Sequence, residues 1–219
     1  MQEYLCDHEV VTRLLSNVLE DEKAQQIMDT LLCDFGSLER ILCATPEQLA
    51  LSIKDTAQIK NKIVFLLACA KALTKRRYTD GFIIGKQYSE DAIVKYLIGL
   101  FLFDNVESIY MLSFDRDGTF LGTDSLGAGT VNNSNVTMRR ALELALRRGA
   151  SYVIFAHNHP MGHTTPSGED MSTTYQLSRA FATVNIEMRE HYIISGNEYR
   201  RINADLAAVA NAQTSPLYR

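Results

Sequence analysis

The sequence predicts an α+β / α/β protein in which a small all-helical part precedes a mixed sheet flanked by helices. Two observations support this fold class. Apolar residues recur at spacings of three and four over the first 80 residues, which is the period of amphipathic helices. After residue 82, short runs rich in β-branched and aromatic residues alternate with helical segments, a pattern typical of a sheet covered by helices.

The helical part is predicted from apolar stripes over residues 10–19 and 24–32, the second ending near Gly36, and from a last helix over about 58–75. Between them, Thr45-Pro46-Glu47-Gln48 indicates a helix start, because proline suits the first helical position and Thr45 with Gln48 can form a capping box. The charged, glycine-containing segment from Lys75 to Gly85 predicts a boundary. We therefore expect a helical domain over 1–80, a second domain over 82–205 and a C-terminal tail over 206–219.

The second domain is predicted to begin with a helix over 89–100 and a strand over 108–114, which Asp115–Gly118 turns back into a second strand. Gly127 and Gly129 indicate a loop, and Thr137 is expected to cap a helix that ends at Gly149. A buried strand over 152–156, a helix over 168–183 and a hairpin over 187–194 and 199–202 complete the order.

Composition and charge limit the function classes. The net charge is −4 and the isoelectric point about 5.7, so duplex DNA would require a local basic patch. The residues from Met1 to Glu9 lack the apolar core of a signal peptide, and no apolar run is long enough to span a bilayer. We therefore expect a cytoplasmic protein that does not contact a membrane. The sequence has no CxxC pair, so we expect its cysteines to be buried free thiols in a reducing cytoplasm; they are Cys6, Cys33, Cys43 and Cys69.

The residues most suited to chemistry follow the buried strand at 152–156. His157 and His159 stand two apart, and in extended backbone such side chains point to the same side. Asp170 comes eleven residues later, in the first turn of the next predicted helix. Two imidazoles and one carboxylate are a common ligand set for catalytic zinc, with a fourth position open to water.

A purely structural interpretation of Asp170 stays open. Ser167-Gly168-Glu169-Asp170 is also an ordinary helix start, in which Ser167 caps the helix and the acidic side chain accepts hydrogen bonds from backbone amides. The two roles can coexist, because a cap holds the first helical turn rigidly and a ligand benefits from such a position.

The segment His157-Asn158-His159-Pro160, with seven residues from His159 to Ser167 and two more to Asp170, resembles the His-x-His-x7-Ser-x2-Asp signature of the JAMM (MPN/Jab) metalloproteases. Within them it is most similar to the RadC-like branch. That family also has a glutamate eight residues before an aspartate, matched here by Glu107 and Asp115. The family's Asp-His pair near the final hairpin appears as Glu190-His191.

The resemblance implies a cytidine-deaminase-like JAMM fold and a zinc metallopeptidase that cleaves a peptide or isopeptide bond of an unknown protein or peptide substrate. It implies that His157, His159 and Asp170 bind Zn²⁺ and that Glu107 is the general base and then acid. It also implies that Ser167 donates a hydrogen bond to the oxyanion. Two departures affect the loop: Met161 replaces the usual serine, and His163 is an additional histidine that we expect to be solvated.

The resemblance also implies an N-terminal helix-hairpin-helix module, whose Gly-x-Gly turn would meet phosphate. The matching segment here, Ile53 to Gln58, lacks both glycines. We therefore expect a degenerate module, although Lys54, Lys60 and Lys62 could still contact DNA. A DNA repair or recombination factor without protease activity remains the alternative function, and an inert scaffold is a third.

Overall fold

A computed structural model describes residues 7–128, 134–160 and 162–202 of the 219-residue chain. The contacts among them divide the chain into two compact units, with the division between Arg77 and Tyr78. The predicted tail over 206–219 and Met161 lie outside the described residues. Within the described parts of the chain, every helix is either too short or too polar to cross a bilayer.

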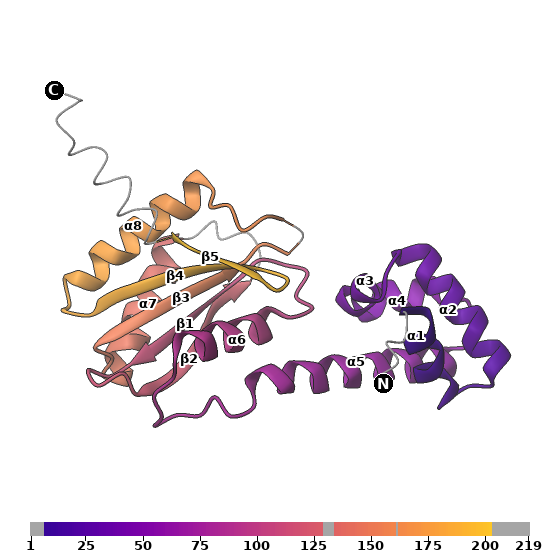
Figure 1. Ribbon diagram of the computed structural model, residues 1–219. Coiled ribbons are helices and arrows are strands. Elements are labelled where there is room, and N and C mark those ends of the chain that lie inside the picture. The colour runs from indigo at the N-terminus through magenta and orange to yellow at the C-terminus, as the bar shows by residue number, and fades with distance from the viewer. Residues whose placement is uncertain (1–6, 129–133, 161, 203–219) are drawn as a thin grey trace. The chain divides into compact units, whose positions relative to one another are not determined.

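The first unit contains α1 (Asp7–Ser16), α2 (Asp21–Phe35), α3 (Leu38–Cys43), α4 (Pro46–Ser52) and all but the last two residues of α5 (Ala57–Thr79), shown in indigo to magenta in Figure 1. Their apolar stripes meet in one core that excludes solvent. Fully burying side chains of this size stabilises a fold by about 1.5–3 kcal/mol each; the core includes Leu15, Met28, Leu31, Ile41, Leu49, Ile63 and Leu67.

Local signals set the ends of these helices. The predicted capping box is confirmed, since Thr45 Oγ1 accepts from the Gln48 amide and the Gln48 side chain accepts from the Thr45 amide. Gly36 ends α2 with a φ of 83° and donates its amide to the Leu32 carbonyl, a conformation that glycine adopts without strain. Helix α3 was not predicted, because six residues are too few to display a helical period.

The second unit contains a five-stranded mixed sheet, which confirms the predicted fold class. Its strands are β1 (Ser108–Phe114), β2 (Phe120–Ala128), β3 (Tyr152–Asn158), β4 (Glu187–Ser195) and β5 (Glu198–Arg201). Their order is β2-β1-β3-β4-β5, in which β3 and β4 are parallel and the other neighbours are antiparallel.

Helices cover both faces of this sheet (Figure 1). Helix α6 (Glu90–Phe101) packs on one face, against Ile154 and Ala156 of β3. Helices α7 (Ser134–Arg148) and α8 (Gly168–Ala182) pack on the other, against Val153 and Phe155. Odd-numbered residues of β3 therefore face α7 and α8, which decides the side on which His157 lies.

The structure corrects several sequence expectations. Thr137 lies inside α7, which begins at Ser134, so it does not cap that helix. Gly127 belongs to β2 and not to a loop, while Gly129 lies outside the described residues. Helix α5 continues to Thr79, through the first half of the segment expected to break it. Buried thiols were expected, whereas Cys33 is exposed and Cys43 and Cys69 are only partly buried; Cys6 lies outside the described residues.

Candidate metal centre

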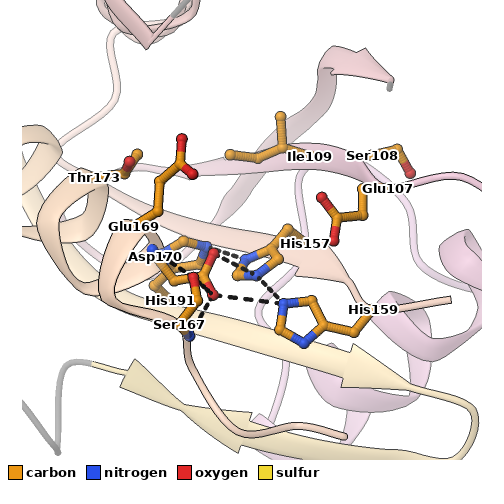
Figure 2. Close-up of a pocket in the computed structure, with 10 residues that line it drawn as sticks. All are labelled: Glu107, Ser108, Ile109, His157, His159, Ser167, Glu169, Asp170, Thr173 and His191. Carbon is orange, nitrogen blue, oxygen red and sulfur yellow. Dashed lines mark hydrogen bonds and ion pairs between the residues drawn. The ribbon is translucent and has the colours of Figure 1, made fainter. Parts of the chain in front are cut away.

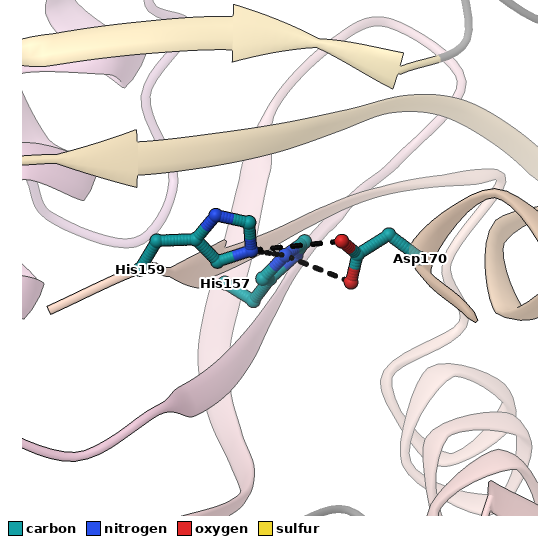
Figure 3. Close-up of side chains that lie close together, drawn as sticks. All are labelled: His157, His159 and Asp170. Carbon is teal, nitrogen blue, oxygen red and sulfur yellow. Dashed lines mark hydrogen bonds and ion pairs between the residues drawn. The ribbon is translucent and has the colours of Figure 1, made fainter. Parts of the chain in front are cut away.

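The two histidines reach one point because strand geometry continues past the end of β3. His157 is the sixth residue of β3 and faces α8, like Phe155 two residues earlier. The His159 amide donates to the Ile194 carbonyl at 2.9 Å, so the extended pairing with β4 persists through His159. The two side chains therefore share a face, and their Nε2 atoms lie 3.1 Å apart (Figure 3).

Asp170 joins them from the first turn of α8. Ser167 is the N-cap, and Asp170 completes a capping box by accepting from the Ser167 amide at 2.7 Å. The same carboxylate approaches the histidines, with Oδ1 3.2 Å from His157 Nε2 and Oδ2 3.6 Å from His159 Nε2. The structure confirms the cap, and the candidate ligand is the same residue, so the two interpretations of Asp170 are compatible.

These three side chains fit a zinc ion. Their ligand atoms all lie within 4.8 Å of one another. A tetrahedral centre with bonds of about 2.0–2.1 Å places neighbouring ligand atoms about 3.3–3.4 Å apart, and the three distances above lie on both sides of that value. Nitrogen from two imidazoles and oxygen from one carboxylate are also the donors that catalytic zinc sites use.

The charge state of Asp170 suits a ligand. Burial raises the pKa of this carboxyl, but the proximity of His157 and the hydrogen bonds from the hydroxyl and amide of Ser167 outweigh burial and leave the pKa well below its ordinary value. Asp170 is therefore ionised at neutral pH.

The second ring nitrogen of each histidine has its own partner. His159 Nδ1 donates to the carbonyl of His163 at 2.8 Å, since a carbonyl can only accept. The His163 side chain itself is exposed, as expected. His157 Nδ1 lies 2.8 Å from Nε2 of His191, which is 2% exposed. Burial, followed by the proximity of His157, lowers the pKa of His191 well below its usual value.

Sheet register brings Glu107 to the same place. Strand β1 pairs antiparallel with β3 so that Ile109 stands opposite His157. Glu107, two residues before Ile109, therefore falls beside His159 on the same face. Both residues line a cavity of about 310 Å³ together with His157 and Asp170. In Figure 2 the exposed Glu107 carboxylate points toward the two histidines.

Asn158 braces the segment that carries Glu107. Its Oδ1 accepts from the Ser108 amide at 2.7 Å and from the Ser108 hydroxyl at 3.2 Å, and its Nδ2 donates to the Val106 carbonyl at 3.1 Å. The residues on both sides of Glu107 are thus hydrogen-bonded to the residue between the two histidines. These contacts of Asn158 join residues 50 and 52 positions apart, so no local pattern in the sequence indicates them.

Ser167 also lines the cavity. Its hydroxyl donates to Asp170 Oδ2 at 2.7 Å and accepts from the Asp170 amide at 3.1 Å. The hydroxyl therefore orients the carboxylate in this structure. Further lining residues to which the sequence assigned no role are Ser108, Ile109, Glu169, Thr173 and His191.

The lysines of the first unit differ in their surroundings. Lys60 donates its ammonium to the Ala50 carbonyl at 2.7 Å and so ties α5 to α4, whereas Lys54 and Lys62 are exposed. At the hairpin turn, the Asp55 carboxylate accepts from the Thr56 amide and pairs with Lys23 at 2.8 Å. The Asp55 carboxylate thus accepts the hydrogen bond of the Thr56 amide, which is no longer available to a phosphate, and it places a negative charge at this turn.

Sequence comparison with known proteins identifies a family and relatives that cover most of the chain. The sequence model of the RadC-like JAB domain matches residues 77–205. A UPF0758 protein of Idiomarina loihiensis is 28% identical over 199 residues, which cover 90% of this chain and 86% of the relative. UPF0758 proteins of Geobacillus thermodenitrificans and Vibrio cholerae are each 29% identical, over 90% and 89% of this chain and 86% and 85% of their own lengths.

Proposed function

The chain belongs to the RadC-like JAB domain family, and from that membership and the site we propose that it is a zinc-dependent hydrolase that cleaves a peptide or isopeptide bond. The observation that carries the proposal is the convergence of His157, His159 and Asp170 in a cavity that Glu107 also lines. The family is related to the JAMM superfamily, whose members are often hydrolytic.

The three ligands have complementary roles in this proposal. His157 and His159 would hold the ion through Nε2, and Asp170 would hold it through its carboxylate. A bound zinc supplies a Lewis acid that polarises a substrate carbonyl and lowers the pKa of water. The Ser167 amide and hydroxyl keep the Asp170 carboxylate aimed at the histidines.

Glu107 would perform the proton transfers. It would take a proton from the attacking water and deliver it to the leaving amine, as a general base and then acid. Its place beside His159 and the bracing of its neighbours by Asn158 support this role. An exposed carboxylate at the rim of the cavity can also exchange its proton with solvent between cycles.

Ser167 would donate a hydrogen bond to the oxyanion that forms on the attacked carbonyl. This requires its hydroxyl to turn from Asp170 toward the substrate. The Ser167 amide can keep the carboxylate in place during that rotation, because it makes a separate hydrogen bond to Oδ2.

A DNA-associated role without hydrolysis remains the alternative. The hairpin turn of the first unit supports it less well, because Asp55 would repel phosphate and Lys60 is engaged by Ala50. Exposed Lys54 and Lys62 are the contacts that such a role would use. A salt-dependent shift of a DNA probe that Lys54→Ala and Lys62→Ala abolish would favour this alternative.

Metal analysis tests the main proposal. Purified wild-type protein should contain about one zinc per chain, and Asp170→Ala and His157→Ala should lose it. Glu107→Gln should keep the zinc but slow hydrolysis of a peptide or isopeptide library by at least about 100-fold. A wild type without zinc, or a Glu107→Gln protein with full activity, would contradict the proposal.

A further inference from the structure

A chain of largely buried hydrogen bonds links two of the candidate ligands. It runs from the Asp170 carbonyl to Thr174 Oγ1 at 2.6 Å, on to His191 Nδ1 at 2.7 Å, and from His191 Nε2 to His157 Nδ1 at 2.8 Å. Figure 2 shows the contact between His191 and His157 at the end of this chain. It joins α8, β4 and β3.

The direction of every bond in the chain follows from its first member. The Asp170 carbonyl can only accept, so the Thr174 hydroxyl must donate to it. The oxygen of Thr174 therefore accepts from His191 Nδ1, which carries the proton of that ring. His191 Nε2 is then an acceptor, so His157 Nδ1 must donate. The lone pair of His157 is left on Nε2, which is the atom that faces His159 and Asp170.

The opposite direction is unfavourable and would block metal binding. If Thr174 donated to His191, two oxygens without a shared proton would face each other at 2.6 Å at the Asp170 carbonyl. His191 would then donate from Nε2 to His157, and His157 would carry its proton on the atom that faces Asp170. Because every hydrogen bond in this series must have the same direction, the Thr174 hydroxyl decides the tautomer of the His157 ring, two hydrogen bonds away.

We propose that Thr174 and His191 are positioning residues that set the tautomer and ring orientation of His157 for metal binding. The inference rests on the proposed metal site but is independent of the substrate. Thr174 is 0% exposed and His191 2% exposed, so water cannot readily replace a lost bond. His159 differs, because its Nδ1 is held by a carbonyl in the polar loop at His163.

Substitution of Thr174 tests the proposal with a matched pair. Thr174→Val keeps the shape but removes the hydroxyl, so His191 loses its acceptor and its proton can move to Nε2. Thr174→Ser keeps the hydroxyl. Partners of metal-bound histidines typically contribute 10–100-fold to metal affinity, so we expect Thr174→Val to weaken zinc binding by about that factor. Thr174→Ser should remain within about threefold of wild type.

The measurements are zinc affinity by competition with a chromophoric chelator and the visible absorption spectrum of Co²⁺-loaded protein. The spectrum reports ligand geometry, which a general loss of stability would not alter. We expect the spectrum of Thr174→Ser to match wild type and that of Thr174→Val to change. Ser113→Ala is the control, because it removes a buried hydroxyl of the same sheet for which no hydrogen-bond partner is found in the described structure.

A second pair covers the case in which Thr174→Val does not fold. His191→Leu removes the acceptor for His157, whereas His191→Gln offers an amide oxygen in its place. We expect the glutamine variant to bind zinc about tenfold more tightly than the leucine variant. If Thr174→Val and His191→Leu both bind zinc as tightly as the wild type does, this inference is overturned, while the proposed function still stands. A wild type that binds no zinc would overturn the proposed function together with it.

Discussion

Replacement of Asn158 by alanine should loosen the segment that carries Glu107 without removing a metal ligand. The Asn158 side chain is 3% exposed and makes three hydrogen bonds, two with Ser108 and one with Val106. Each contributes about 0.5–1.5 kcal/mol net, and a buried donor left unpaired costs about 1–3 kcal/mol. Ser108 is 6% exposed, whereas Val106 is half exposed and can bond to water. We therefore expect Asn158→Ala to lower the free energy of unfolding of the second unit by about 2–4 kcal/mol.

Native-state hydrogen exchange measures this loss without interference from the first unit, because the slowest amides of β1 and β3 report unfolding of the second unit alone. The Ser108 amide should lose protection before its neighbours do. Zinc should bind within about tenfold of wild type, while hydrolysis should fall with the displacement of Glu107. Gln87→Ala is the control, because Gln87 makes a similar bond to the Asp117 carbonyl in an exposed position.

The reasoning fails if Asn158→Ala changes the free energy of unfolding by less than about 1 kcal/mol and leaves exchange at Ser108 unaltered. Asn158→Asp gives a sharper comparison. Its carboxylate can still accept from Ser108, but it cannot donate to Val106 and it places a charge at a buried position. We expect it to be at least as destabilising as the alanine variant.

Three further predictions concern stability. Gly122→Ala should cost about 2–3 kcal/mol in thermal unfolding, because Gly122 has a φ of 147° and its added Cβ would collide with the Arg148 guanidinium that pairs with Asp124; an unchanged melting temperature would contradict this. Thr45→Ala should lower the stability of the first unit by about 1 kcal/mol in urea, and Thr45→Ser should not. Zinc at 100 times its Kd should stabilise wild type by about 2.7 kcal/mol, and Asp170→Asn should lose that gain while keeping its stability in a chelator.

The three candidate metal ligands could be predicted from the sequence, because the backbone geometry of their own strand and helix places them. A period of two places His157 and His159 on one side of a strand, and a helix start places Asp170 in a rigid first turn. The structure brings all three together. These positions follow from backbone geometry within one segment and from the short loop between β3 and α8.

The residues that the sequence could not reveal depend on pairing between distant segments. Glu107 faces the histidines only because β1 pairs with β3 in one register, and the family resemblance was the sole indication of it. Asn158 bonds to residues 50 and 52 positions away. Thr174 meets His191 across a helix–sheet contact, and no property of its own helix distinguishes it from other polar residues.

Short or ambiguous elements account for the remaining differences. Six residues do not reveal a helical period, so α3 was missed although Ser37 caps it. Thr137 had the character of a cap, but the preceding residues already continue the helix. Gly127 was taken for a loop signal, whereas it is the penultimate residue of β2, a strand at the edge of the sheet, where a glycine with a φ of 156° can be accommodated.

The double use of Asp170 has an evolutionary consequence. Because asparagine can accept a hydrogen bond from the Ser167 amide as aspartate does, a single substitution could abolish the proposed metal centre while the start of α8 stays capped. Loss of chemistry would then cost the fold little, and selection for folding alone would not remove such a variant. Under the proposed function, a lineage could keep this domain as a binding surface after it had lost catalysis, and surveys of relatives should find such members by the residue at this one position.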